Sequence, residues 1–256
     1  MKKRGKIYAF SKRNCLEIVR DPLSYLFCLG FPFVMLLVMT LINASVPPEA
    51  GLAIFRIESL SAGIAIFGLM FIMLFTCLIV SKDRSGAFLL RLYVTPMESF
   101  DFILGYMLPA VLLSVIQIAI TFFASFVISL VVGVKISLLG CFVTVGALLP
   151  SVILMISFGL LFGTLFSEKA APGLCSVIIS LGSFLGGIWF DAEATGGVLL
   201  IVCKILPFYH SVQAGRMAFA LDFYGDFAFH FMITVFYALV FVLLSVYAFR
   251  KKMRAD

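Results

Sequence analysis

The residues with side chains suited to catalysis are few, and one group of them falls near the carboxyl end of the chain. This group consists of Asp191, Glu193, His210 and Arg216. Carboxylates, an imidazole and a guanidinium are the groups that an acyl or glycosyl transferase needs for acid–base chemistry and charge stabilisation. A membrane-embedded transferase is therefore one hypothesis. The alternative interpretation is that His210, like His230, is an ordinary residue near the membrane interface.

The sequence contains none of the motifs that hold nucleotides, activated nucleophiles or metals. There is no G-x-x-x-x-G-K-[ST] loop to cradle phosphates, no G-x-S-x-G and no H-E-x-x-H. The six cysteines are scattered singly, and no pair has metal-ligand spacing, so we interpret them as small buried hydrophobes. We therefore expect a chain with no catalytic residues that itself binds no metal or cofactor.

The composition indicates that lipid is the solvent. Hydrophobic residues make up 63% of the 256 positions and charged residues 12%, whereas soluble domains have about 45–50% and about 25%. A spanning helix needs about 20 mostly apolar residues. The fold class predicted is all-α integral membrane, one transmembrane domain over residues 1–256 with kinks expected at Pro109 and Pro150. The six predicted spans are 25–43, 59–80, 102–132, 136–166, 171–190 and 229–249.

The basic residues predict the orientation of these spans. If both termini lie in the cytoplasm, all but four of the 19 Lys and Arg residues fall on the cytoplasmic side; the four are Arg56, Lys135, Lys204 and Arg216. Such an excess is the positive-inside pattern of plasma-membrane proteins. The net charge of +6 is thereby explained by topology, and nucleic acid is not expected as a partner.

Polar residues within the predicted spans are weakly polar, and none is Asp, Glu, Lys or Arg. Proton-coupled carriers and charge-lined channels use intramembrane charges, so a secondary carrier is disfavoured. The weakly polar residues have two interpretations, hydrogen bonding between helices or a substrate path. The residues assigned to a possible path are Gln117, Thr121, Ser180 and Tyr237. Gln117 is the strongest candidate among them.

Residues 6–20 predict an amphipathic helix in the cytoplasmic interface, which Asp21-Pro22 ends. The members singled out are Ile7, Phe10, Leu16 and Arg20. Residues 81–99 predict a second short cytoplasmic helix, with Ser81 as its cap and Ser99 as the cap of the next helix. Apolar side chains on one face of this helix indicate a docking element for a partner protein.

The segment 191–226 is the longest predicted loop and is placed outside. Its apolar run 198–206 is too short to span a bilayer, so a re-entrant or interfacial helix is expected. Two glycine pairs have the spacing that allows helices to pack closely, Gly159 with Gly163 and Gly182 with Gly186. The contact is either within the chain or between two copies.

Several segments together resemble the ABC-2 type transporter permeases over essentially the whole chain. Arg20-Asp21-Pro22 matches the segment before the first span, and Ser85-Gly86-Ala87-Phe88-Leu89-Leu90-Arg91-Leu92-Tyr93-Val94-Thr95-Pro96 resembles the family's coupling helix. Ile103-Leu104-Gly105, Gly186-Gly187-Ile188-Trp189-Phe190, Leu206-Pro207-Phe208-Tyr209-His210 and Gly215-Arg216 follow in the family's order. Two positions depart from the pattern: Lys82-Asp83-Arg84 replaces a more acidic run, and Tyr106 stands where a lysine is frequent.

The resemblance implies a permease subunit of an ABC exporter, two copies of a separate ATPase subunit that binds ATP and Mg, and a second permease, identical or homologous. The implied cargo is a hydrophobic or amphipathic molecule such as a drug, an antimicrobial peptide or a lipid-like compound. The implied external gate consists of Gly187, Trp189, Phe190 and Pro207. The implied ATPase-docking residues are Arg84, Phe88, Leu89, Arg91, Leu92, Tyr93, Thr95 and Pro96.

Overall fold

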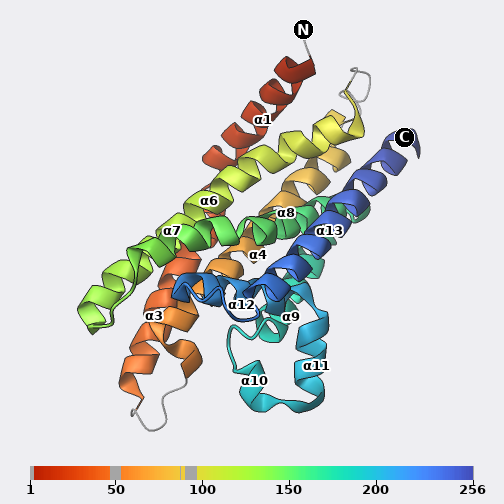
Figure 1. Cartoon of the computed structure of the whole chain (residues 1–256). Helices are drawn as coiled ribbons and strands as arrows, with labels where there is room; N and C mark the ends of the chain where they lie inside the picture. Colours follow the sequence, from red (N-terminus) through yellow and green to blue (C-terminus); the bar gives the residue numbers. More distant parts are fainter. Residues whose placement is uncertain (1–2, 47–52, 87, 90–96, 256) are drawn as a thin grey trace.

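The computed structural model describes residues 3–46, 53–86, 88–89 and 97–255, and within these ranges it contains helices and no strand. Figure 1 shows a bundle of long helices with shorter helices at one end. The amino-terminal helices are α1 (Lys3–Arg20), α2 (Pro22–Tyr25), the π-helical turn η1 (Leu26–Gly30) and α3 (Phe31–Ser45). The central helices are η3 (Ala53–Phe55), α4 (Ile57–Ser85), α6 (Ser99–Val132), α7 (Leu138–Ala147) and α8 (Leu149–Leu165). The remaining helices are α9 (Ala171–Leu185), α10 (Ala192–Thr195), α11 (Gly197–Ile205), α12 (Pro207–Ala220) and α13 (Phe227–Ala255).

The all-α integral membrane fold is confirmed, with spans that differ from the predicted ones. Four stretches are long and apolar enough to cross a membrane: Pro22–Ser45, α4, α6 and Phe227–Lys252. Two bent pairs raise the number of candidates to six, α7 with α8 at 41° and α11 with α12 at 87°. Helix α9, in the predicted fifth span, has 15 residues, fewer than the roughly 20 that a bilayer needs.

The two proline predictions have different outcomes. Helix α6 runs through Pro109 without a break. The bend between α7 and α8 comes at Leu148, just before Pro150, which occupies the first turn of α8. A proline is favoured at that position because the first amide groups of a helix have no partner within it.

Helix α4 is the centre of the bundle, and every residue from 61 to 70 is buried. Its closest neighbour is α8, and glycines allow the approach: a Cβ atom on Gly159 would lie 2.4 Å from the Met73 carbonyl oxygen, and one on Gly163 would lie 2.7 Å from that of Cys77. Gly182 faces Met70 of α4. Both glycine pairs therefore pack within the chain.

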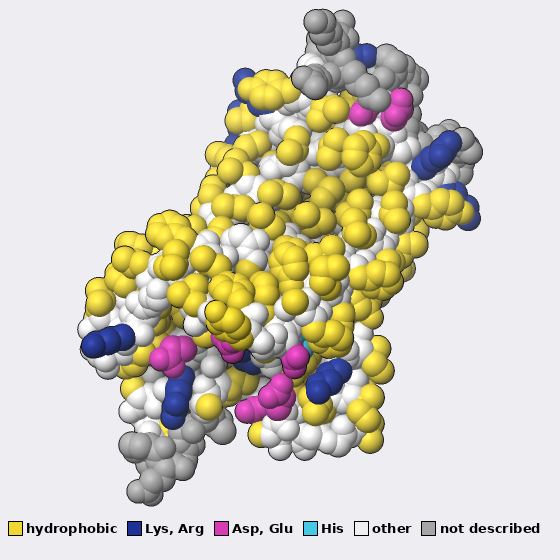
Figure 2. Space-filling view, in the orientation of Figure 1, with side chains coloured by type: hydrophobic (Ala, Val, Ile, Leu, Met, Phe, Trp, Pro, Cys, Tyr) yellow, Lys and Arg dark blue, Asp and Glu magenta, His cyan; other side chains and the backbone are white. Residues whose placement is uncertain are grey.

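The start of α1, the end of α4, the start of α6 and the end of α13 lie at the same end of the bundle (Figure 1). We call this the basic end, because it carries Lys82, Arg84, Arg250, Lys251 and Lys252. Figure 2 shows hydrophobic side chains over the middle of the visible face and charged side chains toward the ends. This distribution is the one expected of a protein that sits across a lipid layer.

Three local predictions are wrong. Ser81 does not cap a short helix, since α4 continues through it to Ser85. The cap of α6 is Glu98, which forms a capping box with Asp101, rather than Ser99. Most of the second half of the predicted outer loop is α12, a helix whose His210, Ser211 and neighbouring residues are buried.

Candidate functional site

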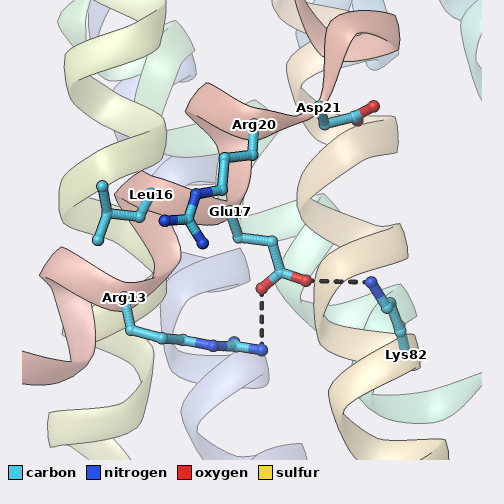
Figure 3. Close-up of a pocket in the computed structure, with 6 residues that line it drawn as sticks. All are labelled: Arg13, Leu16, Glu17, Arg20, Asp21 and Lys82. Atoms are coloured by element: carbon cyan, nitrogen blue, oxygen red, sulfur yellow. Dashed lines mark hydrogen bonds and ion pairs between the residues drawn. The ribbon is translucent and has the colours of Figure 1, made fainter.

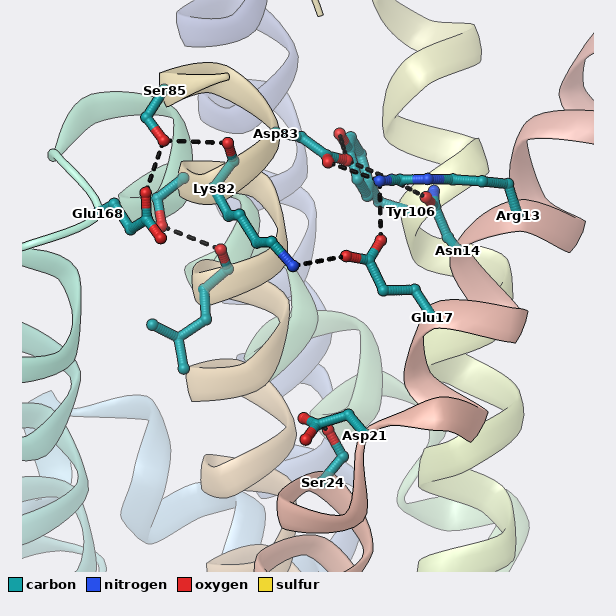
Figure 4. Close-up of polar contacts among 12 residues, drawn as sticks. Arg13, Asn14, Glu17, Asp21, Ser24, Lys82, Asp83, Ser85, Tyr106 and Glu168 are labelled. Carbon is teal, nitrogen blue, oxygen red and sulfur yellow. Dashed lines mark hydrogen bonds and ion pairs between the residues drawn. The ribbon is translucent and has the colours of Figure 1, made fainter. Parts of the chain in front are cut away.

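A polar and aromatic cluster joins three helices at the basic end. We call it the junction and define it by Arg13 and Asn14 of α1, Asp83 of α4, and Gly105 and Tyr106 of α6. Asp83 is 3% exposed and Asn14 is 1% exposed, although both are polar. Polar groups persist at such burial only when they are hydrogen-bonded or paired. Figure 4 shows these side chains converging between the helices.

A two-pronged ion pair is the strongest contact in the junction. The Arg13 guanidinium donates to both oxygens of Asp83, at 2.5 and 2.8 Å. The Tyr106 hydroxyl donates to the same carboxylate at 2.8 Å. Burial lowers the pKa of Arg13. The hydrogen bond and charge of Asp83, with the charge of Glu17, outweigh burial, so the pKa of Arg13 is raised above the ordinary value. The two hydrogen bonds from the Arg13 guanidinium fasten α1 to α4, and the Tyr106 hydroxyl joins α6 to the same carboxylate.

A second layer of charge lies on the outer side of the ion pair. Glu17 forms an ion pair with Arg13 at 2.9 Å and accepts a hydrogen bond from Lys82 at 3.2 Å. The Lys82 side chain is 63% exposed, so this contact contributes little to stability. Glu17 nevertheless links α1 to α4 one helical turn from Arg13.

Aromatic rings pack against the inner side of the junction. Phe10 contacts Phe102 and Tyr106 edge to face, with centroids 5.7 and 4.9 Å away. It also stacks on Phe88 at 6.3 Å, and the Arg13 guanidinium lies 4.2 Å from the centroid of the Phe88 ring. The start of the segment that resembles the coupling helix is therefore held by the same cluster.

Gly105 allows α1 to approach α6. A Cβ atom at this position would lie 2.1 Å from Cδ1 of Phe10. The Gly105 carbonyl accepts a hydrogen bond from the Asn14 amide at 3.1 Å. The glycine of the Ile103-Leu104-Gly105 motif thus has a structural reason in this chain, which is close contact with the amino-terminal helix.

A Gly105→Ala variant is expected to unfold at lower temperature, with a loss of about 1–3 kcal/mol, the usual cost of overpacking. The Phe10 ring cannot move away freely because three other rings surround it. Thermal unfolding of the detergent-solubilised chain measures the effect. The loss should shrink when Phe10→Ala is added, and equal losses in the two backgrounds would show that the contact is not the cause.

Arg84, predicted to dock the ATPase, has a different role in the described structure. Its guanidinium donates to the carbonyl oxygens of Thr164 and Phe166 at the end of α8. Nearby, Ser85 donates to Glu168 at 2.6 Å. These contacts tie the end of α4 to the link between α8 and α9.

The other predicted docking residues divide into two sets. Phe88 is half-buried in the junction and Leu89 is 1% exposed, so the expectation that Leu89 faces the cytosol is wrong; it packs in the core instead. The second set lies outside the described residues and consists of Arg91, Leu92, Tyr93, Thr95 and Pro96.

Residues 6–20 are helical, as predicted, within α1, and the place of this helix in the membrane interface stays a prediction. Phe10 packs inward together with Asn14 and Ile18, one helical turn apart each. Leu16 is 42% exposed and Arg20 is exposed, while Ile7 is half-buried. The exposed apolar side of α1 remains available to lipid.

The structure places the predicted substrate-path residues on three helices, α6, α9 and α13. Gln117 and Thr121 are buried on α6 and bond to each other at 3.1 Å. The Tyr237 hydroxyl donates to the Ile205 carbonyl at 2.7 Å. Ser180 lies on α9 and lines an apolar cavity against α4. Most hydroxyl groups at depth donate to a carbonyl of their own helix, as Ser114 does to Ala110.

The predicted gate residues lie in the turn after α9 and at the start of α12. Arg216 of α12 donates to the Gly187 carbonyl at 2.9 Å, and Gly187 has φ +67°, a conformation that favours glycine. Trp189 packs edge to face on Phe67 with centroids 5.2 Å apart. Phe190 contacts Phe184, and the buried Pro207 begins α12.

The residues considered for a transferase make structural contacts in the described part of the chain. Asp191 caps α10 by accepting from the backbone amides of Glu193 and Ala194. Glu193 accepts from the Tyr209 hydroxyl at 2.7 Å, and His210 is bonded to His230 and to the Lys204 carbonyl. In the part of the chain described, no His, Cys, Asp and Glu groups are arranged to hold a metal.

The sequence model of the family described as "ABC-2 type transporter" matches residues 5–220 of the chain. The chain belongs to the ABC-2 type transporter family. A comparison with curated proteins found no match. Family membership identifies a multi-pass membrane protein, the permease subunit of an ABC transporter, whose family partner is an ABC ATPase. The matched part of this ABC-2 permease contains the junction and extends to the last residue of α12.

Three junction residues of this ABC-2 permease were not assigned a role from sequence: Arg13, Asn14 and Asp83. Two departures from the family pattern bear on these residues: Lys82-Asp83-Arg84 in place of a more acidic run, and Tyr106 where a lysine is frequent. In the structure Asp83 receives its positive partner from α1 instead, together with the hydroxyl of Tyr106. Arg13 and Asp83 are 70 positions apart in the sequence, so their ion pair cannot be predicted from local spacing.

Proposed function

We propose that this ABC-2 permease exports a hydrophobic or amphipathic molecule from the cytoplasm or the inner leaflet, powered by a separate ATPase subunit. Two permeases, identical or homologous, would pair with two ATPase copies. The absence of a G-x-x-x-x-G-K-[ST] loop from the sequence supports the division of labour. The apolar spans without central charges support a cargo that is itself largely apolar.

The observation that carries the proposal is the junction. Phe88 lies near the start of the segment that resembles the coupling helix, residues 85–96, and it stacks on Phe10 and contacts the Arg13 guanidinium. Arg13 in turn is bound to Asp83. A partner that displaced the segment after Phe88 would therefore act on α1, α4 and α6 together. Such a rigid connection suits the transfer of ATPase closure to the spans.

We further propose that the basic end faces the cytoplasm and that the membrane is the plasma membrane. The start of α1, the end of α4, the start of α6 and the end of α13 share this end (Figure 1). The positive residues Lys82, Arg250, Lys251 and Lys252 are concentrated there, in agreement with the positive-inside rule. The turn after α9 and the pair α11–α12 would then form the external gate.

The proposal is tested by reconstituting the chain with its cognate ATPase and comparing variants. Leu92→Asp is expected to reduce complex formation and permease-stimulated ATP hydrolysis at least tenfold, because interface energy is concentrated in a few apolar anchors. Tyr224→Asp is the matched control, since Tyr224 is fully exposed in the connection between α12 and α13. Phe88→Asp should also reduce permease-stimulated ATP hydrolysis, but this substitution disturbs the junction as well.

Unchanged stimulation of ATP hydrolysis in the Leu92→Asp complex would contradict docking through this segment. Loss of stimulation in the Tyr224→Asp control would show instead that any new surface charge is harmful. Both variants must first give the melting temperature of the parent chain.

A further inference from the structure

Three overlapping cavities descend from the basic end along α4. The outer cavity, of about 560 Å³, is polar, and Figure 3 shows its lining of Arg13, Leu16, Glu17, Arg20, Asp21 and Lys82. The middle cavity, of about 220 Å³, shares Glu17, Asp21 and Lys82 with it. The inner cavity, of about 420 Å³, shares Leu23, Phe75 and Leu78 with the middle one. Neighbouring cavities share lining residues, and the three together form a groove. The lining of this groove changes from mostly charged side chains in the outer cavity to mostly apolar ones in the inner cavity.

The inner cavity is lined mostly by aromatic and aliphatic side chains from four elements, α2, η1, α4 and α9. Phe27 of η1 and Phe71 of α4 stack with centroids 5.8 Å apart, and Phe75 lies 6.3 Å from Phe27. Helix α9 closes the other side with Ser180 and its neighbours. The size is in the range of small-molecule sites, which are roughly 300–1,000 Å³ and mostly apolar.

The middle cavity combines an apolar floor with an excess of negative charge. Its charged residues are Glu17, Asp21, Glu168 and Lys82. Glu17 is neutralised by Arg13 and Lys82. Among the described residues, Asp21 and Glu168 form no ion pair: Asp21 accepts from Ser24 at 2.6 Å, and Glu168 accepts from Ser85 at 2.6 Å (Figure 4).

We propose that the middle and inner cavities bind a cationic amphiphile. Its ammonium or phosphonium group lies in the middle cavity, which Asp21 and Glu168 line, and its apolar body lies against Phe27, Phe71 and Phe75. Charges at the cavity attract the cation, and the aromatic faces add cation–π attraction. The inference deepens the proposed function, on which it rests, by naming the class of molecule exported.

An anionic head group fits the groove less well. The Lys82 ammonium is already engaged by Glu17. Arg20 lines the outer cavity but not the middle one, so it does not border the apolar space that would hold the tail. Lys82, the positive residue that lines the middle cavity, is therefore paired, whereas Asp21 and Glu168 line the same cavity and form no ion pair among the described residues.

The test uses the purified full-length permease in nanodiscs and two probes of nearly equal shape and opposite charge, tetraphenylphosphonium and tetraphenylborate. Equilibrium binding of the phosphonium should be saturable. The double variant Asp21→Asn/Glu168→Gln should weaken it about tenfold, a difference of about 1.4 kcal/mol. Asparagine still caps a helix and glutamine still accepts from Ser85, so the fold is retained. Asp222→Asn, an exposed carboxylate in the α12–α13 connection, should bind as the parent does.

A steric variant provides an independent arm. Ser180→Trp should fill the inner cavity and abolish phosphonium binding, whereas Val177→Trp, exposed on the same helix but not lining the cavity, should leave it unchanged. Binding unaffected by the double variant, or tighter binding of tetraphenylborate at the same residues, would overturn the proposal. Binding is measured without an ATPase, so its failure is distinguishable from a failure of the ATPase to dock.

Discussion

An Asp83→Ala variant is expected to lose about 3 kcal/mol of stability and to uncouple ATP hydrolysis from transport. Removal of one partner leaves the other charge in a partly buried site without compensation, which costs about 3–5 kcal/mol for fully buried pairs. Arg13 is 35% exposed, so the lower part of that range applies. Because the Tyr106 hydroxyl also loses its acceptor, α1 and α6 are loosened together.

The double variant Arg13→Met/Asp83→Leu separates the ion pair from the packing around it. Replacement of both partners by apolar residues is often close to neutral for stability, so the double variant should be more stable than Asp83→Ala alone. Coupling should still be impaired, since the directional link between α1 and α4 is gone. Thermal unfolding and transport per ATP hydrolysed are the two measurements.

Lys82→Met is the matched control for this prediction. Lys82 belongs to the same helix turn but is 63% exposed and pairs with Glu17, so its loss should change stability by about 1 kcal/mol or less. Equal destabilisation by Lys82→Met and Asp83→Ala would mean that burial of the Asp83 carboxylate is not the cause of the stability loss.

A Gly159→Ala variant is expected to be among the most destabilising single substitutions in the chain, with a loss of about 3 kcal/mol or more. The added methyl group would meet the backbone oxygen of Met73 at 2.4 Å and the Thr76 side chain at 2.9 Å. A backbone atom in the most buried helix cannot turn aside as a flexible side chain can, so α4 and α8 must separate along their length. Overpacking of this kind costs typically 1–3 kcal/mol and occasionally more.

Gly146→Ala is the control, because nothing lies within 4 Å of a Cβ atom at this position in α7. Alanine is a better helix former than glycine by about 0.5–1 kcal/mol, so this variant should be neutral or slightly more stable. Melting temperatures of the two variants in the same detergent decide the prediction. Similar values would show that α4 and α8 do not approach as closely as the structure has them.

The sequence predicted the features that depend on local signals. The end of α1 at Asp21-Pro22 and the bend before Pro150 follow from proline chemistry. Four of the six predicted spans follow from uninterrupted apolar runs. Helix α12 was missed because His210, Ser211 and Arg216 interrupt its hydropathy. Those polar groups are accommodated by bonds to distant segments, such as Arg216 to the Ser59 carbonyl at 3.2 Å, which no window reveals.

The candidate site was predictable only in outline. The segment before Pro96 and the glycine at position 105 were identified as motifs, but their contacts were not. Arg84 was assigned to the ATPase from the family resemblance, whereas in the described structure its guanidinium donates to the carbonyl oxygens at the end of α8. Leu89 was expected to be exposed because a helical wheel gives a face and does not show what covers it.

The central claim is that the basic end is the cytoplasmic face, where a separate ATPase binds. Cysteine labelling of two variants with a membrane-impermeant maleimide, in a Cys15→Ser background, tests it most directly. If the basic end is cytoplasmic, the Ser85→Cys variant is labelled in inverted vesicles but not in intact cells, and added ATPase protects it from labelling. The Thr195→Cys variant in α10 should show the opposite sidedness and no protection. Labelling of the Ser85→Cys variant from outside intact cells would contradict the account.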